Sequence, residues 1–184
     1  IPHRDDGTPL PEKGAFFVPN SYLLEVCARH PGLLIPAVSI HPARRDALGE
    51  LERCLQAGAR VLKLLPNCLN VDYSEPRHRL FWERMAAARM ILLSHTGGEF
   101  SLPVICPKFA DPRLLRYPLE CGVTVIAAHC AGRSALLDAD HTSVLLEMFK
   151  QWPRLFGDNS ALCSPFRCRT LPKILAEPIR HRII

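Results

Sequence analysis

Short apolar runs alternate along the chain with longer stretches whose apolar residues recur at helical spacing. Continuous apolar runs of this kind are typical of strands that are buried on both faces of a parallel sheet. The predicted strands are residues 33–40, 61–65, 90–93, 123–128, 154–157 and 182–184, with a short earlier one at residues 16–18. The predicted helices are residues 21–30, 45–57, 76–89, 112–121, 142–152 and 170–181. Strands that alternate with helices predict βαβ units and an α/β fold.

Two architectures fit this alternation: an open doubly wound sheet and a closed (β/α)8 barrel of the TIM type. No GxGxxG or GxxxxGK[ST] motif follows the first predicted strand, so a nucleotide-binding open sheet lacks its main sequence signal. Polar residues instead follow nearly every strand, as they do where a barrel builds its active site from many strand ends. We therefore expect a single α/β domain of the TIM-barrel type over residues 1–184.

The predicted strands are too few for a closed barrel. A TIM barrel has eight strands and about 250 residues, whereas this chain has 184 residues and at most seven predicted strands. We expect an incomplete barrel that covers about strands 2 or 3 to 8 and lacks strand 1 and the end of strand 8, as a fragment of a longer protein would. Its unpaired strand edges would favour poor solubility or self-association, and a homo-oligomer is one expected outcome.

Five ionisable residues stand at or near the ends of successive predicted strands: His41, Lys63, His95, His129 and Asp158. They are 22, 32, 34 and 29 residues apart, which is close to the roughly 30 residues of one βα unit. One such residue per unit therefore reaches the same level of the barrel. Packing alone does not explain five ionisable groups on one rim, so the pattern indicates an active site.

His95 and His129 are the candidate metal ligands among these residues. They end neighbouring predicted strands, and small-residue loops at 96–98 and 130–132 leave room beside them for a substrate. A lone His at a strand end is usually a structural residue with a satisfied ring. The pair favours a divalent metal, above all zinc, because neutral imidazole is the commonest zinc ligand.

Lys63 interrupts an apolar strand, where an unpaired buried ammonium group is costly. It could pair with Asp158 or Glu99, bind a substrate carboxylate, or be carboxylated and bridge metal ions. Pairing or substrate contact is favoured over carboxylation. Asp158 could accept a proton during catalysis, or it could serve only as the partner of Lys63.

The remaining polar residues near strand ends are candidates for substrate binding. His41, which precedes Pro42, could contact the substrate or only orient its loop. Glu99 follows the predicted metal ligand His95, and Asn159 follows Asp158; Asn159 could hydrogen-bond the substrate or start a turn. The other histidines are expected at the surface: His3, His30, His78, His141 and His181.

Composition argues against several classes of partner. The net charge is only +5, aromatic residues make up 7%, and no run of five basic residues occurs, so nucleic-acid binding is not expected. No apolar run reaches the roughly 18 residues of a membrane helix, and no signal peptide is visible. None of the eight cysteines forms a CxxC pair, so we expect reduced thiols in a cytoplasmic protein that acts on a small molecule.

Five ordered segments resemble the amidohydrolase-related family that includes aminocarboxymuconate-semialdehyde decarboxylase. They read SIHP at residues 39–42, KLLPN at 63–67, LSHTGGE at 93–99, AHCAG at 128–132 and GDNSAL at 157–162. Each segment alone has low specificity, but the ordered set is fairly specific and covers nearly the whole chain. The resemblance implies a (β/α)8 barrel that binds a divalent metal, often zinc.

By this resemblance His95 matches the family's strand-five metal ligand. His129 matches the strand-six His, which is a ligand or a polariser of bound water and substrate. The family also has a His-x-His pair on strand one and an Asp on strand eight, and neither occurs in this sequence. Asp158 matches strand seven instead, and residues 182–184 resemble the start of strand eight. The resemblance therefore implies an incomplete metal site.

The reaction favoured by these residues and by the resemblance is metal-dependent hydrolysis of a C–N or C–O bond in a small carbonyl substrate. His129 would stabilise the developing oxyanion, and Lys63 would anchor an anionic group of the substrate. One alternative is non-oxidative decarboxylation of an unsaturated or aromatic acid. Another is a non-catalytic barrel that binds a protein, or a fragment that is inactive by itself.

Overall fold

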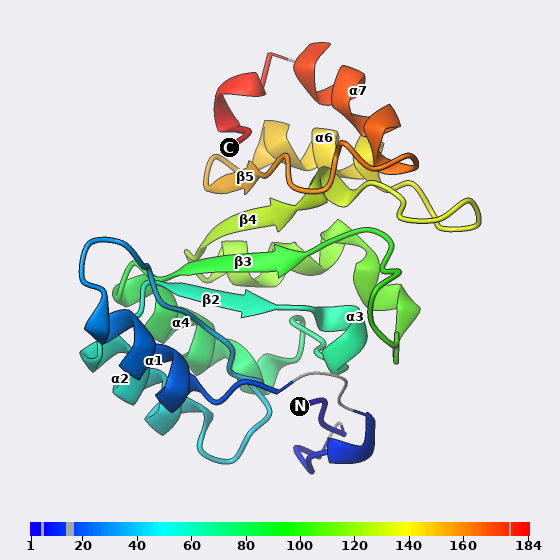
Figure 1. Cartoon of the computed structure of the whole chain (residues 1–184). Helices are drawn as coiled ribbons and strands as arrows, with labels where there is room; N and C mark the ends of the chain where they lie inside the picture. The colour runs from blue at the N-terminus through cyan, green and yellow to red at the C-terminus, as the bar shows by residue number, and fades with distance from the viewer. Residues whose placement is uncertain (5, 14–16, 177) are drawn as a thin grey trace.

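A computed structural model describes residues 1–4, 6–13, 17–176 and 178–184. Its five strands are all parallel and form one sheet in the order β1-β2-β3-β4-β5. Strands adjacent in sequence are therefore adjacent in the sheet, as in the βα units of a barrel (Figure 1). The strands are β1 Ala37–Val38, β2 Val61–Leu64, β3 Ile91–His95, β4 Thr124–Ala128 and β5 Leu155–Gly157.

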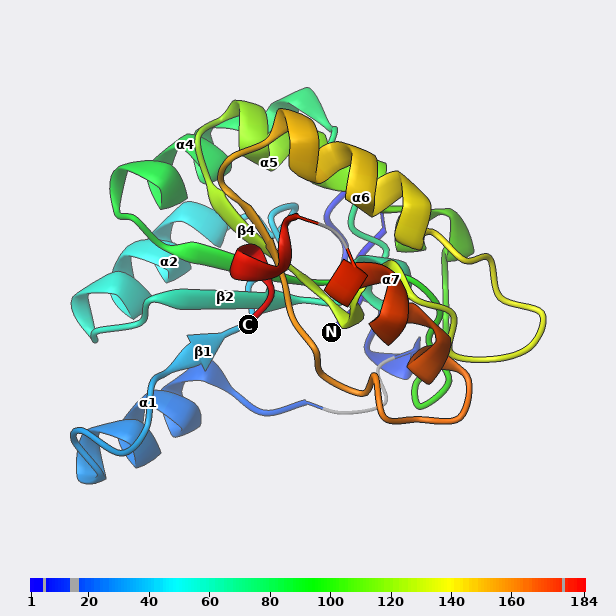
Figure 2. The ribbon, with the colours of Figure 1, turned by 90° about the horizontal axis from the view of Figure 1, so that it is seen from above.

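Helices α2, α4, α5 and α6 lie along one side of the sheet, as the view from above shows (Figure 2). The α-helices of the described residues are α1 Asn20–Arg29, α2 Ala47–Gln56, α3 Pro66–Leu69, α4 Arg79–Ala87, α5 Arg116–Glu120, α6 Thr142–Gln151 and α7 Leu171–Ala176. Short 3-10 helices include Pro76–His78, Pro107–Ala110, Pro112–Leu115, His129–Ala131, Arg167–Thr170 and Arg180–Arg182. A further one is Pro11–Lys13.

The hydrophobic core lies between the sheet and these helices. Leu62 of β2, Leu92 of β3 and Val125 of β4 are fully buried and belong to one cluster with Trp82 of α4 and Phe149 of α6. Successive strand residues point to opposite faces of a sheet, so every second residue of each strand faces this core. Burial of these large side chains is the main favourable contribution to folding.

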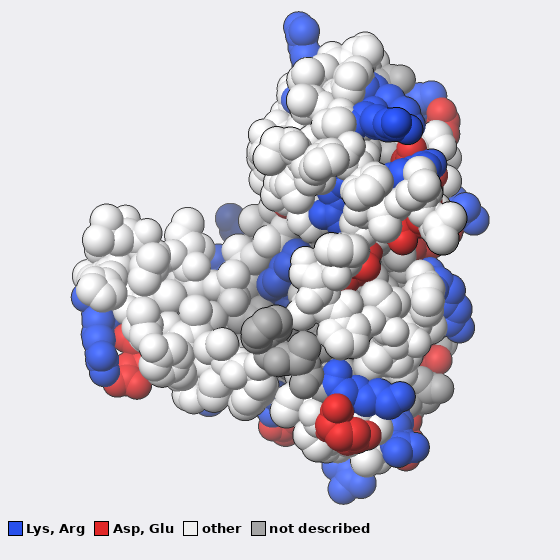
Figure 3. All heavy atoms as spheres, turned by 45° about the vertical axis from the view of Figure 1, so that its right-hand side comes forward, with Lys and Arg blue, Asp and Glu red and all other residues white. Residues whose placement is uncertain are grey.

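The opposite face of the sheet is covered less completely. Lys63, Leu93, Ile126 and Phe156 pair in register across four strands, and all four are only partly buried. In a closed TIM barrel this face would be the packed interior. Figure 3 shows the molecule hollowed between two projecting parts, with Lys or Arg atoms visible inside the hollow.

The N-terminal residues pack beside the first two strand ends. The His3 and His41 rings are 4.4 Å apart between centroids, and both side chains line a cavity of about 890 Å³. His3 and His78 are 7% and 3% exposed. The expectation that both lie at the surface is therefore wrong, because each ring is packed inside and hydrogen-bonded to a backbone carbonyl.

Five of the predicted strands are confirmed, although the first is much shorter than expected. Residues 33–35 belong to the predicted strand at 33–40 but are exposed, and only Ala37–Val38 pairs with β2. The prediction at residues 16–18 lies partly outside the described residues, and residues 17 and 18 form no strand. The run at 182–184 contributes a single parallel bridge from Ile183 to Gly157 instead of a strand.

The predicted helices are confirmed over most of their lengths, with two corrections. The stretch at 170–181 is not one helix: α7 ends at Ala176, and a separate 3-10 helix covers Arg180–Arg182. The first turns of the helices predicted at 76–89 and 112–121 are 3-10 helices. Helix α3 was not predicted, because its four residues are too few to show a period.

Two composition-based expectations can be compared with the described part of the chain. None of its helices has the length and apolarity needed to cross a membrane. All eight cysteines are free in the structure, and Cys163 and Cys168 are exposed.

Candidate functional site

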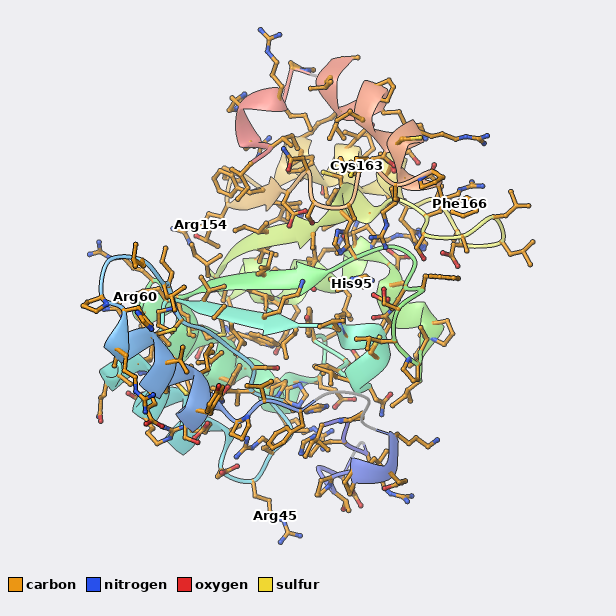
Figure 4. The ribbon with its side chains drawn as sticks, in the orientation of Figure 1. Arg45, Arg60, His95, Arg154, Cys163 and Phe166 are labelled. Atoms are coloured by element: carbon orange, nitrogen blue, oxygen red, sulfur yellow. The ribbon has the colours of Figure 1, made fainter. Side chains whose placement is uncertain are left out.

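His95 and His129 meet at the carboxyl ends of neighbouring strands. His95 is the last residue of β3 and pairs in register with Ala128, the last residue of β4, which His129 directly follows. The two imidazole rings are 5.1 Å apart between centroids and cross at 67°. In Figure 4 His95 lies at this end of the sheet, whereas Arg60 and Arg154 lie at the other end. The structure thus brings the two predicted ligands together.

The His95 ring is 1% exposed and has one nitrogen without a partner. Its Nδ1 is 3.6 Å from Glu99 Oε2, and no described group hydrogen-bonds to its Nε2. Burial, reinforced by the neighbouring His129, lowers the pKa of His95. A neutral imidazole whose Nδ1 faces a carboxylate presents the Nε2 lone pair, the arrangement found in metal-bound histidines.

His129 begins a strained backbone turn. Residues His129, Cys130 and Ala131 have φ values of 63°, 47° and 57°. Three successive non-glycine residues in the left-handed region are unusual, because each costs roughly 1–2 kcal/mol. Strain of this kind persists only where surrounding contacts hold it, and it is concentrated at functional sites.

Two buried or half-buried side chains hold this turn. Thr96 Oγ1 donates to the Ala128 carbonyl at 2.7 Å and accepts from the Ala131 amide at 3.1 Å. Asp158 Oδ1 accepts from the His129 amide at 2.8 Å. The loops after β3 and β5 therefore fix the loop after β4 that presents His129.

Ser160 sets the tautomer of His129. Its hydroxyl donates to Asp158 Oδ1, so the hydroxyl oxygen and the Ser160 carbonyl, at 2.8 and 3.1 Å, accept from His129 Nδ1. The proton then lies on Nδ1, and Nε2 keeps its lone pair. Burial and the charge of Arg167 lower the pKa of His129. Both imidazoles are therefore neutral at physiological pH.

Lys63 lies on β2, in the row of residues on the sheet face opposite the helices. Burial lowers the pKa of its ammonium group, and the charges of Asp158 and Glu99 partly oppose this effect. No carboxylate of the described residues lies within the 4.0 Å that defines an ion pair with Lys63. Its partners in the fold are therefore long-range charges, and a direct ion pair with Asp158 or Glu99 is not formed.

Asp158 and Glu99 are both engaged with their own loops. Asp158 directly follows β5, and the three hydrogen bonds that the described residues donate to its carboxylate all go to Oδ1. Glu99 Oε1 accepts from the Ser101 and Leu102 amides, while Oε2 faces His95. Asp158 Oδ1 and Glu99 Oε1 thus accept hydrogen bonds from backbone amides, and Glu99 Oε2 faces the His95 ring.

The hydrogen bonds of the His41 ring and of the Asn159 amide go to backbone groups and not to the imidazole pair. His41 Nε2 donates to the Leu69 carbonyl, and Nδ1 accepts from the Ala43 amide, both at 3.1 Å. Burial lowers the pKa of His41 to about 3. The backbone amide of Asn159 donates to the Ile184 carbonyl at 2.9 Å. Both ring nitrogens of His41 are used by backbone, so its observed contacts orient a loop.

Sequence reasoning missed Arg167, which the fold brings to the same site. Its side chain is 6% exposed and Nη2 donates to the Gly98 carbonyl, on the loop that follows His95. It also missed the contacts by which Thr96 and Ser160 hold the loop of His129. The sequence offers no signal for Arg167, because it stands in an aperiodic segment nine residues beyond Asp158.

The described residues fit only part of a metal site. No group of three His, Cys, Asp or Glu side chains among them is placed to bind one metal ion together. A catalytic zinc takes three protein ligands. The unpartnered Nε2 of His95 and the free Nε2 lone pair of His129 have the chemistry of two such ligands. The remaining ligands would have to come from groups other than the described ones.

Comparison with known proteins shows the family and the fold of the chain. The sequence model of a family described as amidohydrolase matches residues 12–183, nearly the whole chain. No curated protein sequence matches.

Solved structures with the same fold share little sequence with the chain. An uncharacterized TIM-barrel protein from Bordetella bronchiseptica has 17% identity and a TM-score of 0.68 over 91% of this chain and 58% of its own. A putative 2-pyrone-4,6-dicarboxylic acid hydrolase from Pseudomonas putida has 18% identity and a TM-score of 0.63, covering 90% and 60%. A 2,6-dihydroxybenzoate decarboxylase has 16% identity and a TM-score of 0.60, covering 90% and 63%.

The chain thus spans about three fifths of the length of these proteins. The matches confirm the predicted fold, an incomplete α/β barrel of the TIM type.

Proposed function

Because the chain belongs to the amidohydrolase family, we propose that it forms part of the active site of a metal-dependent hydrolase acting on a C–N or C–O bond of a small carbonyl substrate. The observation that carries this proposal is the pair of neutral imidazoles at adjacent strand ends, with His95 Nε2 buried and unpartnered. A buried polar atom without a partner is costly. A metal-binding histidine needs a ring nitrogen that is left free for the metal, whereas a structural histidine has no need of one.

A divalent metal at this site, with zinc as the favoured ion, would supply Lewis acidity and an activated water. His95 would bind it through Nε2, and the Glu99 carboxylate beside Nδ1 would keep the ring in the correct tautomer. His129 would act through its own Nε2 as a second ligand or as a group that polarises the substrate carbonyl. The left-handed turn and Ser160 fix the direction of that nitrogen.

Asp158 would act at the same end of the sheet as a catalytic carboxylate. Its Oδ1 positions His129, and its second oxygen could accept a proton from the attacking water. Glu99 and Asn159 are the proposed substrate contacts on the neighbouring loops, and His41, on the segment that follows β1, is a further one. These roles follow from placement at the strand ends.

Lys63 would bind an anionic group of the substrate. Its side chain is partly buried and has no ion pair among the described residues. Two of the similar structures are named for a dicarboxylic acid hydrolase and a dihydroxybenzoate decarboxylase, and both names denote acids. A small-molecule acid or its ester is therefore the proposed substrate class.

Non-oxidative decarboxylation of an unsaturated or aromatic acid is the second candidate. The similarity of the fold to a decarboxylase supports it. Hydrolysis of a lactone or amide releases an acid, whereas decarboxylation releases carbon dioxide and consumes a proton. Measuring both products from a panel of small cyclic esters and aromatic acids separates the two reactions.

Metal content and its dependence on His95 test the proposal. The protein, purified with any flanking sequence that its gene encodes, should hold one equivalent of a divalent metal. The variant His95→Ala should weaken zinc binding by at least about 100-fold. The matched control His181→Ala removes an exposed imidazole and should leave binding unchanged. Absence of stoichiometric metal together with no effect of His95→Ala would leave a non-catalytic barrel as the better description.

A further inference from the structure

Arg167 crosses from the loop after β5 to the loop after β3. It begins the 3-10 helix Arg167–Thr170, and its Nη2 donates to the Gly98 carbonyl. Gly98 also lies against the loop that carries Asp138, because a Cβ at Gly98 would meet the Asp138 carboxylate. The guanidinium is therefore held beside His95 and Glu99 although it is distant from them in sequence.

This guanidinium is buried without a counter-ion. It is 6% exposed, its Nε has no hydrogen-bond partner, and no carboxylate of the described residues lies within the 4.0 Å of an ion pair. A buried charge that is neither paired nor fully hydrogen-bonded costs several kcal/mol. A protein keeps such a group where a ligand supplies the missing anion.

The nearby carboxylates do not fill this role. Glu99, Asp138 and Asp158 all act on Arg167 through long-range charge. Each of them accepts hydrogen bonds from other groups: Glu99 from the Ser101 amide, Asp138 from Ser134, and Asp158 from Ser160 on its own loop and from the His129 amide on the loop after β4. Their geometry therefore leaves the guanidinium edge unclaimed.

Lys63 forms a second cation of the same kind on β2. Both Lys63 and Arg167 act electrostatically on His95 and on His129. The imidazole pair is therefore flanked by one cation from the second strand and another from the loop after the fifth strand. A buried guanidinium and a partly buried ammonium group, both without ion pairs among the described residues and both acting on neutral imidazoles, favour an anionic ligand at this site.

We propose that Arg167 binds a carboxylate group of the substrate, beside the imidazole pair. The inference rests on the proposed function, because it names the substrate class and a specificity residue of the same site. A planar guanidinium matches the two oxygens of a carboxylate. Phosphate offers the same oxyanion chemistry, so the test includes it as a separate arm.

Binding of a small dicarboxylate to the full chain tests this role. Phthalate is titrated into the protein by isothermal calorimetry, with neutral dimethyl phthalate and inorganic phosphate as the other ligands. The variant Arg167→Gln should weaken phthalate binding by roughly tenfold or more, since a hydrogen bond to a charged group is lost. Arg167→Lys keeps the charge and should weaken binding less than Arg167→Gln.

The matched control is Arg169→Gln, two residues along the same 3-10 helix, where the side chain is exposed. It should bind phthalate like the wild type, and dimethyl phthalate should bind none of the variants measurably. Three results overturn the inference: no phthalate binding by the wild type at millimolar concentrations, unchanged binding by Arg167→Gln, or an equal loss in Arg169→Gln. Tighter binding of phosphate than of phthalate would overturn the choice of carboxylate.

Loss of fold does not explain the expected result if Arg167→Gln keeps the far-ultraviolet circular dichroism of the wild type. If Arg167→Gln unfolds, Arg167→Lys takes its place in the test, because lysine keeps a donor for the Gly98 carbonyl but lacks the planar fork. Its phthalate binding should then be weaker than that of the wild type. The binding assay is independent of hydrolysis. If the protein has no metal and no activity but binds phthalate through Arg167, the proposed function fails and the inference about Arg167 holds. If the protein is an active enzyme and Arg167→Gln leaves its KM unaltered, the proposed function holds and the inference about Arg167 fails.

Discussion

Replacing Thr96 with valine tests how the site holds its strained turn. The two side chains have nearly the same shape, but valine lacks the hydroxyl that joins the Ala128 carbonyl to the Ala131 amide. Thr96 is 2% exposed and Ala131 is fully buried. Water therefore cannot replace the lost hydrogen bonds without opening the loop.

The expected loss of stability follows from those two contacts. An unpaired buried donor costs about 1–3 kcal/mol, and the carbonyl loses one of its acceptor contacts. The left-handed turn adds a stored strain of roughly 1–2 kcal/mol per residue, which these contacts must offset. We expect Thr96→Val to lower the free energy of unfolding by about 2–4 kcal/mol. Thr96→Ser keeps the hydroxyl and should lose only about 1 kcal/mol, for one buried methyl group.

Urea denaturation gives both free energies, and hydrogen exchange of the Ala131 amide gives the local effect. The amide should exchange faster in Thr96→Val than in Thr96→Ser by a larger factor than amides of the distant helix α2. The reasoning is refuted if Thr96→Val is as stable as the wild type, or if serine and valine destabilise equally. Equal loss would show that packing of the methyl group, and not the hydroxyl, holds the turn.

Three further changes have predicted outcomes. Asp158→Asn keeps an acceptor oxygen for the turn and should unfold within about 1 kcal/mol of the wild type, whereas Asp158→Ala should lose about 2 kcal/mol or more in urea denaturation; equal stabilities would contradict the positioning role. Burial lowers the pKa of His41 from 6.5 to about 3, so below pH 6.5 the unfolded chain binds a proton that the folded chain does not. His41 alone should therefore lower stability by about 2 kcal/mol between pH 7 and pH 5, and His41→Gln should remove that part of the pH dependence. An unchanged pH dependence of stability in His41→Gln would contradict this prediction. Gly97→Ala should cost about 3 kcal/mol or more, because φ is +77° and the new Cβ would lie 2.2 Å from the Gly132 carbonyl oxygen. Gly49→Ala is the control in an open helical position, and it should stabilise by up to about 1 kcal/mol; equal effects would refute the close approach at Gly97.

The sequence predicted the sheet best at its central strands, which are fully buried on the helix-covered face and, contrary to the expectation, only partly buried on the other. Residues 61–64, 91–95 and 124–128 are short apolar runs, and all three are central strands. The run at 33–40 has the same apolar composition, but Leu33 and Ile35 are 81% and 76% exposed. Composition does not distinguish an apolar edge segment from a buried strand, since the difference lies in which neighbour covers it.

The candidate site was predicted at its strand-end residues and missed at its loop contacts. One ionisable residue per βα unit placed His95 and His129 together, because carboxyl ends of parallel strands meet at one edge. Thr96, Ser160 and Arg167 act through contacts between loops that lie 31 to 69 residues apart. Such contacts depend on the backbone path of each loop, which has no period in the sequence.

A crystal of the protein grown with zinc and measured at the zinc absorption edge tests the central claim most directly. The account predicts an anomalous peak about 2.0–2.1 Å from His95 Nε2, on the side of the ring that faces His129. A zinc-loaded crystal with no peak at His95, or with its metal bound only elsewhere in the molecule, would contradict it.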